Sequence, residues 1–277
     1  MTLAGRHELP GARRLVVKVG SSSISGDGAH RIAPLVDALA TAHARGTEVV
    51  LVSSGAIATG MPYLALDERP TDLATQQAAA AVGQNVLIYR YQEALRQYAI
   101  VAGQVLLTAG DLENPTHRSN ARRAMERLLG LRILPIVNEN DTVATHEIRF
   151  GDNDRLAALV AQLIGADALV LLSDIESLYT RPPGEPGARP IRDVAHGDDL
   201  SGYEFGSVVV NSVGTGGAAT KASAAKLAAD AGVGVLVTSA DLVSDALDGA
   251  DVGTWFAPNP APAPSGFTGA VRTGVAH

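Results

Sequence analysis

Continuous apolar runs alternate with longer, helically patterned segments along most of this chain. Each apolar run predicts a buried strand, and the runs occupy residues 13–19, 48–52, 103–107, 133–137 and 168–172. The intervening segments predict helices at about residues 30–45, 71–98, 116–130 and 153–164. Because continuous apolar strands are typical of parallel sheets buried on both faces, the predicted fold class is α/β. We expect a three-layer α-β-α sandwich around a mostly parallel sheet.

The C-terminal half continues this pattern with more irregular sequence. Residues 142–150 predict a short hairpin, residues 181–190 an exposed loop rich in proline and glycine, and residues 207–238 a further βαβ-like unit. The last residues are rich in proline, glycine and alanine. We therefore predict one domain over residues 8–257, followed by a tail at residues 258–277.

Composition excludes several classes of function. The chain of 277 residues has no cysteine, which rules out disulfides, thiolate metal ligands and a cysteine nucleophile. A net charge of −7 makes a nucleic-acid or membrane-surface partner a poor expectation. No apolar run approaches the roughly 20 residues of a membrane span, and residues 1–10 lack the apolar core of a secretory signal. The expected location is the cytoplasm.

In sheets of this kind, ligands bind beyond the carboxyl ends of the strands, so the residues just after each strand are the first to consider. Lys18 stands in an otherwise apolar strand and is followed by Gly20. A buried lysine is costly without a partner, so it either faces a phosphate or extends to solvent from an edge strand. The small residues of Ser53–Gly60 form either an anion-binding nest of backbone N–H groups or an ordinary tight turn.

Two polar clusters lie close together at Asn138–Asp141 and Gly151–Asp154. Asn and Asp favour turns for local reasons, so each cluster alone has a purely structural interpretation. Together, one after a strand and one opening a helix, they offer acids for an ammonium group and amides for a carboxylate. A metal site is an alternative, because hard cations take oxygen ligands. Asp154 also suits the N-terminus of a helix electrostatically.

A glycine-rich segment occupies residues 214–221. It is not a Walker A motif, because Thr220 precedes Lys221 instead of following it. Gly214, Gly216 and Ala219 do match the dinucleotide pattern G-x-G-x-x-A, and this keeps an NAD(P)-binding oxidoreductase open. Lys221, in the first turn of the expected helix, favours phosphate oxygens.

Lysines at two of these strand ends indicate phosphoryl transfer, in which a protein mainly positions reactants and neutralises charge. A carboxylate acceptor would need no general base, because a glutamate side chain with a pKa of about 4.3 is already ionised at pH 7. The absence of histidine from these motifs is consistent with such an acceptor.

The motifs as a set resemble the amino acid kinase family, and most closely its branch that phosphorylates glutamate, over residues 13–256. The resemblance rests on these segments: Val-Val-Lys-Val-Gly at 16–20, Ser-Ser-Gly-Ala-Ile-Ala-Thr-Gly at 53–60, Ala-Val-Gly-Gln at 81–84, Gly-Gln-Val-Leu-Leu-Thr at 103–108, Asn-Glu-Asn-Asp at 138–141, Gly-Asp-Asn-Asp at 151–154, Leu-Leu-Ser-Asp at 171–174, Gly-Thr-Gly-Gly…Thr-Lys at 214–221 and Gly-Thr-Trp-Phe at 253–256.

This resemblance implies an enzyme that converts ATP and L-glutamate to ADP and L-glutamyl 5-phosphate, the first step of proline biosynthesis, with Mg²⁺ on the nucleotide. It also implies feedback inhibition by proline and a homo-oligomer, a dimer or a tetramer. The implied catalytic residues are Lys18, Asp154 and Lys221, with Asp154 orienting the lysines. The implied glutamate-binding residues are Ser54, Gly55, Asn138, Asp141, Asp152 and Asn153. The implied nucleotide-binding residues are Lys18, Gly20, Ser173, Asp174, Thr215, Gly216, Gly217, Ala218, Ala219, Thr220 and Lys221. No metal ligand is assigned.

The sequence departs from the family pattern at three places. Many members carry a second, RNA-binding type domain, which we expect to be absent here. Ser177 stands where glycine is usual, and Ala218-Ala219 replace larger residues in the glycine-rich segment. None of these changes removes a charged group that the chemistry needs. Besides the oxidoreductase, a sister kinase with another acceptor and a non-catalytic amino acid sensor stay as alternatives.

Overall fold

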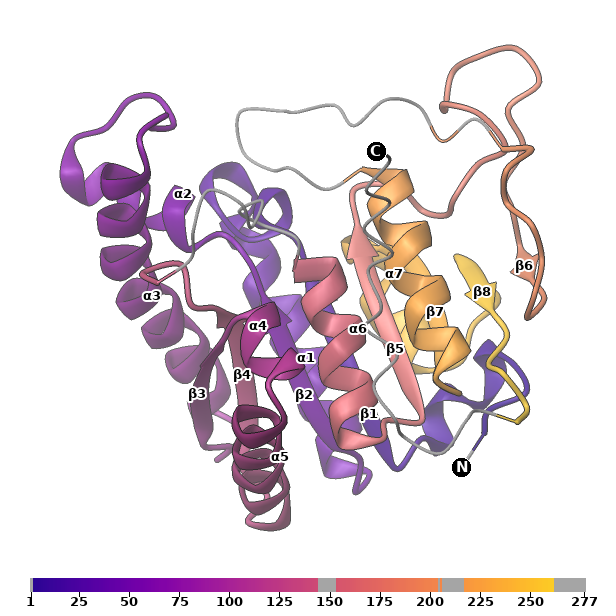
Figure 1. Ribbon diagram of the computed structural model, residues 1–277, viewed down its shortest axis with the longest axis horizontal. Coiled ribbons are helices and arrows are strands. Elements are labelled where there is room, and N and C mark those ends of the chain that lie inside the picture. Colours follow the sequence, from indigo (N-terminus) through magenta and orange to yellow (C-terminus); the bar gives the residue numbers. More distant parts are fainter. Residues whose placement is uncertain (1, 144–152, 204, 206–216, 262–277) are drawn as a thin grey trace, which may run out of the picture.

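An eight-stranded, mostly parallel sheet forms the centre of the computed structural model, which describes residues 2–143, 153–203, 205 and 217–261 (Figure 1). The strand order is β3-β4-β2-β1-β5-β7-β8-β6. The strands are β1 (Arg14–Val19), β2 (Glu48–Ser53), β3 (Ala102–Leu107), β4 (Leu134–Glu139), β5 (Ala168–Ser173), β6 (Asp193–Val194), β7 (Gly234–Ser239) and β8 (Thr254–Phe256).

Helices cover both faces of this sheet. One layer holds α1, α3 and α8, and the other holds α4, α5, α6 and α7. The helices are α1 (Ile32–Ala44), α2 (Ala56–Gly60), α3 (Leu73–Arg96), α4 (Ala109–Glu113), α5 (Pro115–Gly130), α6 (Asn153–Ile164), α7 (Ala218–Asp230) and α8 (Val243–Leu247). Short 3₁₀ helices occupy Arg6–Gly11, Ser21–Ser23, Gly26–Arg31, Met61–Leu64 and Ala240–Leu242. The predicted α/β sandwich with a mostly parallel sheet is confirmed.

The two-residue period of a strand decides which layer each side chain of β1 meets. Val17 and Val19 belong to the core beneath α1, whereas Val16 belongs to the core beneath α6 and α7. Lys18 has the same parity as Val16, so its side chain leaves the sheet on the α6 and α7 side. This places the ammonium group near the beginnings of those two helices.

Two glycines allow α2 to lie against α3 at backbone distance. A Cβ added to Gly83 would fall 1.7 Å from the carbonyl oxygen of Ala56, and one added to Gly60 would fall 1.9 Å from that of Ala79. No side chain fits in either place. The close approach fixes α2, and with it the turn at Ser54 and Gly55 that leads into the helix from β2.

The predicted strands and helices are present with boundaries shifted by one to a few residues, and the helix at 153–164 ends where it was expected. The sequence pattern did not predict that β8 runs antiparallel to β7 or that β6 lies at the edge beyond it. Nearly all of the expected hairpin at 142–150, the first part of the unit at 207–238 and most of the tail lie outside the described residues. The division at residue 258 stays a prediction.

Candidate active site

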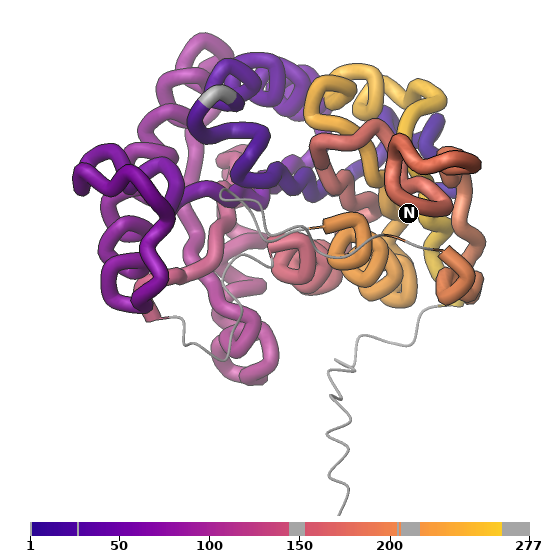
Figure 2. The backbone as a smooth tube through the Cα atoms, turned by 90° about the horizontal axis from the view of Figure 1, so that it is seen from above, coloured from indigo at the N-terminus to yellow at the C-terminus, as the bar shows by residue number. Residues whose placement is uncertain are grey.

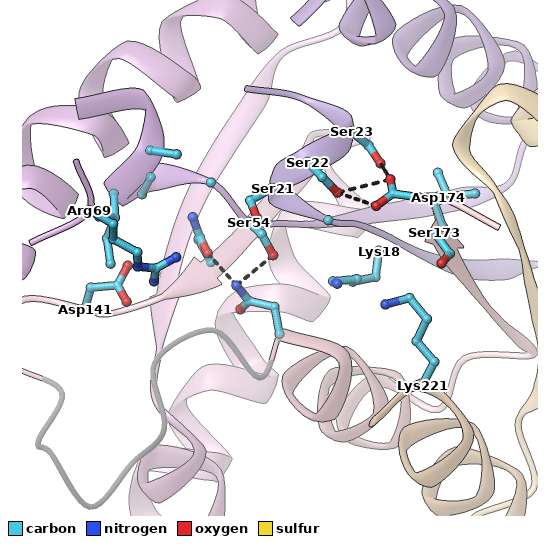
Figure 3. A pocket seen from close by; sticks show the side chains of 18 residues that line it. Lys18, Ser21, Ser22, Ser23, Ser54, Arg69, Asp141, Ser173, Asp174 and Lys221 are labelled. Carbon is cyan, nitrogen blue, oxygen red and sulfur yellow. Dashed lines mark hydrogen bonds between the residues drawn. The ribbon is translucent and has the colours of Figure 1, made fainter. Parts of the chain in front are cut away.

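One cavity opens at the edge of the sheet where the parallel strands end, and Figure 2 looks down onto that edge. It lies beyond the ends of β1, β2, β4 and β5 and beside the starts of α6 and α7 (Figure 3). Its lining includes ten of the residues predicted from the sequence: Lys18, Gly20, Ser54, Gly55, Asn138, Asp141, Asn153, Ser173, Asp174 and Lys221.

At one end of the cavity, Asp154 holds two lysines from different elements. Its Oδ1 lies 2.6 Å from Nζ of Lys18, and its Oδ2 lies 3.2 Å from Nζ of Lys221. The Oγ1 of Thr220 also donates to Oδ2 of Asp154, at 3.2 Å. The side chains of Lys18, Asp154 and Lys221 are only 5%, 2% and 7% exposed. Both lysines, but not Asp154, line the cavity, so the carboxylate lies behind the two cations.

The electrostatics of this trio keep Asp154 ionised. Burial alone raises the pKa of Asp154, but the ammonium groups of Lys18 and Lys221 outweigh burial and lower that pKa to about 2. Two cations share one anion, so the trio carries a net charge of +1 in a nearly dry environment. An anionic ligand such as a phosphate would compensate that charge.

Next to the trio, three polar side chains form a hydrogen-bonded cluster. The Nδ2 of Asn153 donates to Oγ of Ser54 at 3.0 Å and to Oδ1 of Asn138 at 3.2 Å. The backbone N–H of Glu139 also donates to Oδ1 of Asn138, at 2.9 Å. Nδ2 of Asn138 and Oδ1 of Asn153 are buried and have no hydrogen-bond partner among the described residues. Buried polar atoms are nearly always hydrogen-bonded. The amide donor of Asn138 and the amide acceptor of Asn153 therefore suit a polar ligand in the cavity.

The far end of the cavity combines a carboxylate with a guanidinium group. Asp141 follows β4, and Arg69 extends toward it from the loop before α3 (Figure 3). Burial, with a smaller contribution from the nearby Glu139, raises the pKa of Asp141 to about 7, although the charge of Arg69 opposes that rise. Without a ligand, Asp141 is therefore a carboxyl group close to its titration point at neutral pH.

The wall next to β5 presents hydroxyl groups and a second carboxylate. Ser22 donates to both oxygens of Asp174, at 3.1 and 2.9 Å, and Ser23 donates to Oδ1 at 3.3 Å. A Cβ added to Gly20 would lie 3.9 Å from Nζ of Lys18, an ordinary contact distance, so Gly20 forms the part of the cavity wall beside that ammonium group. Ser173 completes this side of the cavity.

The glycine-rich segment is only partly described. Gly217 caps the start of α7, and its carbonyl oxygen accepts a hydrogen bond from Oγ1 of Thr220 at 2.9 Å. Ala219 and Thr220 line a neighbouring groove with Arg155, not the cavity itself. Ala218 is the first residue of α7 and does not line the cavity either. The remaining predicted residues, Asp152, Thr215 and Gly216, lie outside the described part of the chain.

Sequence reasoning missed Arg69 and the hydroxyl contacts of Ser22 and Ser23. The two serines follow Lys18 and Gly20 in the same strand-end turn, so their position did carry a signal. Arg69 lies in a loop between Met61–Leu64 and α3 and follows no strand. No rule about strand ends could have selected it.

The described residues do not contain a ready-made metal cage. No group of three His, Cys, Asp or Glu side chains among them is arranged to hold a metal ion. Mg²⁺ in nucleotide sites is usually held by one or two carboxylates together with phosphates and water. Of the carboxylates near the lysines, Asp154 is occupied by ion pairs, whereas Asp174 accepts hydrogen bonds from the hydroxyl groups of Ser22 and Ser23. Asp174 therefore fits a nucleotide-bound Mg²⁺ better than Asp154 does.

Within the described residues, no helix is long and apolar enough to cross a membrane.

The sequence of residues 13–239 matches the amino acid kinase family. A carbamate kinase from Giardia lamblia, solved with AMP-PNP bound, has a similar fold, with a TM-score of 0.65 and 16% identity over 90% of this chain and 100% of that one. At this identity the likeness concerns the fold alone. The chain belongs to the amino acid kinase family.

Closer relatives narrow the comparison within that family. Glutamate 5-kinases from Clavibacter sepedonicus and from Clavibacter michiganensis subsp. michiganensis are each 73% identical to this chain over 258 residues, covering 93% of the chain and 99% of each relative. The glutamate 5-kinase of Salinispora arenicola is 54% identical over 261 residues, covering 92% of this chain and 70% of the relative.

Proposed function

We propose that this chain transfers the γ-phosphoryl group of ATP to the side-chain carboxylate of L-glutamate, giving ADP and L-glutamyl 5-phosphate, the first step of proline biosynthesis. The single observation that carries the proposal is the buried Lys18–Asp154–Lys221 trio, which lines one end of the cavity with two cations. The 73% identical relatives with this activity support the same conclusion.

The reaction needs positioning and charge neutralisation more than proton transfer. An oxygen of the glutamate side-chain carboxylate attacks the γ-phosphorus, and the bond from that phosphorus to the β,γ-bridging oxygen breaks as ADP leaves. The attacking carboxylate is already ionised at pH 7, so no proton has to be removed. Lys18 and Lys221 are placed to neutralise the phosphoryl oxygens, and Asp154 fixes the separation of the two ammonium groups.

The rest of the cavity divides between the two substrates. Ser54 offers a hydroxyl group to glutamate, and Asn138 and Asn153 offer an amide donor and an amide acceptor that have no partner among the described residues. Asp141 would bind the substrate's ammonium group, and Gly55 and Asp152 belong to the same predicted subsite.

For ATP we assign Gly20, Ser173, Asp174 and the segment Thr215, Gly216, Gly217, Ala218, Ala219, Thr220 and Lys221. The N–H groups at the start of α7 suit phosphates. Mg²⁺ bound to the nucleotide would supply further neutralisation of phosphate charge.

Trapping of the acyl phosphate with hydroxylamine tests this proposal. Incubation with ATP, L-glutamate and hydroxylamine should yield the γ-hydroxamate, and omission of ATP should abolish it. Replacing Lys221 by methionine keeps an unbranched side chain of nearly the same length, removes the charge and should abolish turnover. Product from N-acetylglutamate, aspartate or carbamate but not from glutamate would overturn the assigned acceptor.

Two alternatives from other classes make different predictions. An NAD(P)-dependent oxidoreductase would bind NAD(P) in calorimetric titration and ignore ATP, whereas a kinase would show the reverse. A non-catalytic amino acid sensor would keep its biological role after Lys221→Ala. Membership in the amino acid kinase family and the charged trio both favour the kinase.

The family resemblance also supports proposals about regulation and assembly. We expect a cytoplasmic homo-oligomer, a dimer or a tetramer, that L-proline inhibits and that has no nucleic-acid or membrane partner. Light scattering coupled to size-exclusion chromatography measures the oligomeric state. Inhibition kinetics with L-proline at several glutamate concentrations measure the feedback.

A further inference from the structure

Arg69 enters the active-site cavity at the end opposite the catalytic lysines. In Figure 3, Lys18 and Lys221 lie on one side of Ser54, and Arg69 and Asp141 lie on the other. Arg69 is half-buried, and its guanidinium group makes no hydrogen bond to any other residue that the structure describes. Arg69 therefore lines the cavity with N–H donors that no described residue uses.

The backbone that carries Arg69 is held in place on its C-terminal side. The carbonyl oxygen of the next residue, Pro70, accepts a hydrogen bond of 2.7 Å from Nε2 of Gln76 on α3. Two residues further, the side chain of Asp72 caps α3 by accepting from the N–H of Thr75 at 2.8 Å. The loop is therefore attached to a 24-residue helix directly after Arg69, and this favours a defined direction for the arginine.

Three charges must be matched when glutamate binds: the reacting side-chain carboxylate, the α-ammonium group and the α-carboxylate. Lys18 and Lys221 match the reacting side-chain carboxylate, and Asp141 matches the α-ammonium group. None of the residues assigned so far is a cation at the Asp141 end. Without a charged donor in this partly buried site, the α-carboxylate would make no charge-assisted hydrogen bond. The site would then also fail to reject amines that lack an α-carboxylate.

We propose that Arg69 binds the α-carboxylate of the acceptor amino acid and so selects an acceptor with an intact α-carboxylate. This inference rests on the proposed function. The planar guanidinium group offers paired N–H donors that match the two oxygens of a carboxylate, a geometry that a lysine cannot supply. Asp141 beside it holds the neighbouring ammonium group, so the two side chains together recognise the zwitterionic end of the substrate.

A purely electrostatic role is the competing explanation. Arg69 lies close enough to Asp141 to oppose the rise in the pKa of that carboxyl group, so its loss could weaken binding indirectly. In that case the loss would be the same for every acceptor that carries the ammonium group. Direct contact with the α-carboxylate predicts a loss only for acceptors that possess it.

Comparing L-glutamate with L-isoglutamine separates these explanations, because isoglutamine replaces only the α-carboxylate by a neutral carboxamide. ADP release with each acceptor gives kcat/KM for the wild-type protein, Arg69→Gln and Arg69→Lys. In the wild type, isoglutamine should have a kcat/KM roughly 10- to 150-fold lower, the range expected for one charge-assisted hydrogen-bond pair. Arg69→Gln should lower kcat/KM for glutamate by a similar factor, mostly through KM, and leave that for isoglutamine nearly unchanged. For Arg69→Lys, kcat/KM with glutamate should lie between the values of the wild type and of Arg69→Gln.

Equal losses for both acceptors in Arg69→Gln would overturn the proposal and favour the indirect route through Asp141. A kcat/KM for glutamate that stays at the wild-type value in Arg69→Gln would overturn it as well. Arg96→Gln, an exposed arginine at the other end of α3, removes the same charge and should change neither acceptor. Failure of the proposed function would look different, because the wild-type protein itself would then show no glutamate-dependent release of ADP.

Discussion

Lys18 and Asp154 form a nearly buried ion pair of 2.6 Å, although 135 intervening positions separate them in the sequence. Lys18 comes from β1 and Asp154 from the first turn of α6, and α6 packs on the face of the sheet that Lys18 leaves. Asp154 reaches Lys221 of α7 as well. One carboxylate thus fixes two cations that the fold delivers from different elements.

Asp154→Asn should lower kcat far more than it weakens glutamate binding. The amide keeps the shape of the carboxylate but loses its charge and one acceptor oxygen, so it cannot hold both Lys18 and Lys221 in position, and transition-state charge is stabilised poorly. We expect kcat to fall about 100-fold or more, with KM for glutamate within a fewfold of the wild-type value. Steady-state kinetics with varied glutamate at saturating ATP measure both numbers. A large rise in KM with kcat intact would contradict the role assigned to Asp154.

The sequence predicted the sheet and its covering helices because continuous apolar runs and helical spacing are local signals. The antiparallel direction of β8 was not predicted, since three residues, Thr254–Phe256, carry no information about which way a strand runs. The same limit applies to the site. Lys18 alone was ambiguous between a phosphate ligand and a solvated strand residue, and the resemblance to a family resolved the ambiguity. Arg69 gave no signal, because only the folded loop brings it to the cavity.

The ion pairs of Asp154 should also appear in the pH dependence of stability. The pKa of Asp154 in the folded protein, about 2, lies below its ordinary value of 3.8. A lowered pKa stabilises the folded state above pH 4, and this stabilisation is lost as the pH falls from 4 toward 2. The pKa difference corresponds to about 2 kcal/mol. Urea unfolding of the wild type and Asp154→Asn should show a gap in stability at pH 6 that narrows below pH 4.

An exposed aspartate provides the control for that measurement. Asp67→Asn changes the net charge by the same amount in a loop exposed to solvent, and its stability should follow that of the wild type at every pH. A gap between the wild type and Asp154→Asn that stays constant from pH 6 to pH 3 would show that Asp154 does not titrate as the buried ion pairs require.

Asp141 should make glutamate binding sensitive to pH near neutrality. The pKa of Asp141 is raised to about 7 by burial and by Glu139, with Arg69 opposing the rise. Only the ionised carboxylate can hold the substrate's ammonium group, so kcat/KM for glutamate should fall as the pH drops from 8 to 6. The ammonium group of bound glutamate lowers the pKa of Asp141 in the complex, so kcat should fall only at a lower pH than kcat/KM does. In Asp141→Asn, kcat/KM should be low and nearly independent of pH over this range.

The contact between α2 and α3 should tolerate no side chain at Gly83. A methyl group there would lie 1.7 Å from the carbonyl oxygen of Ala56, so Gly83→Ala must push α2 away from α3 and shift the turn that carries Ser54. We expect a loss of roughly 1–3 kcal/mol in the free energy of unfolding, together with a raised KM for glutamate. Gly130→Ala is the matched control, because a Cβ at Gly130 meets nothing within 4 Å. Urea unfolding and glutamate kinetics of both variants measure the difference. Equal stability of the two variants would mean that α2 is free to move without disturbing the site.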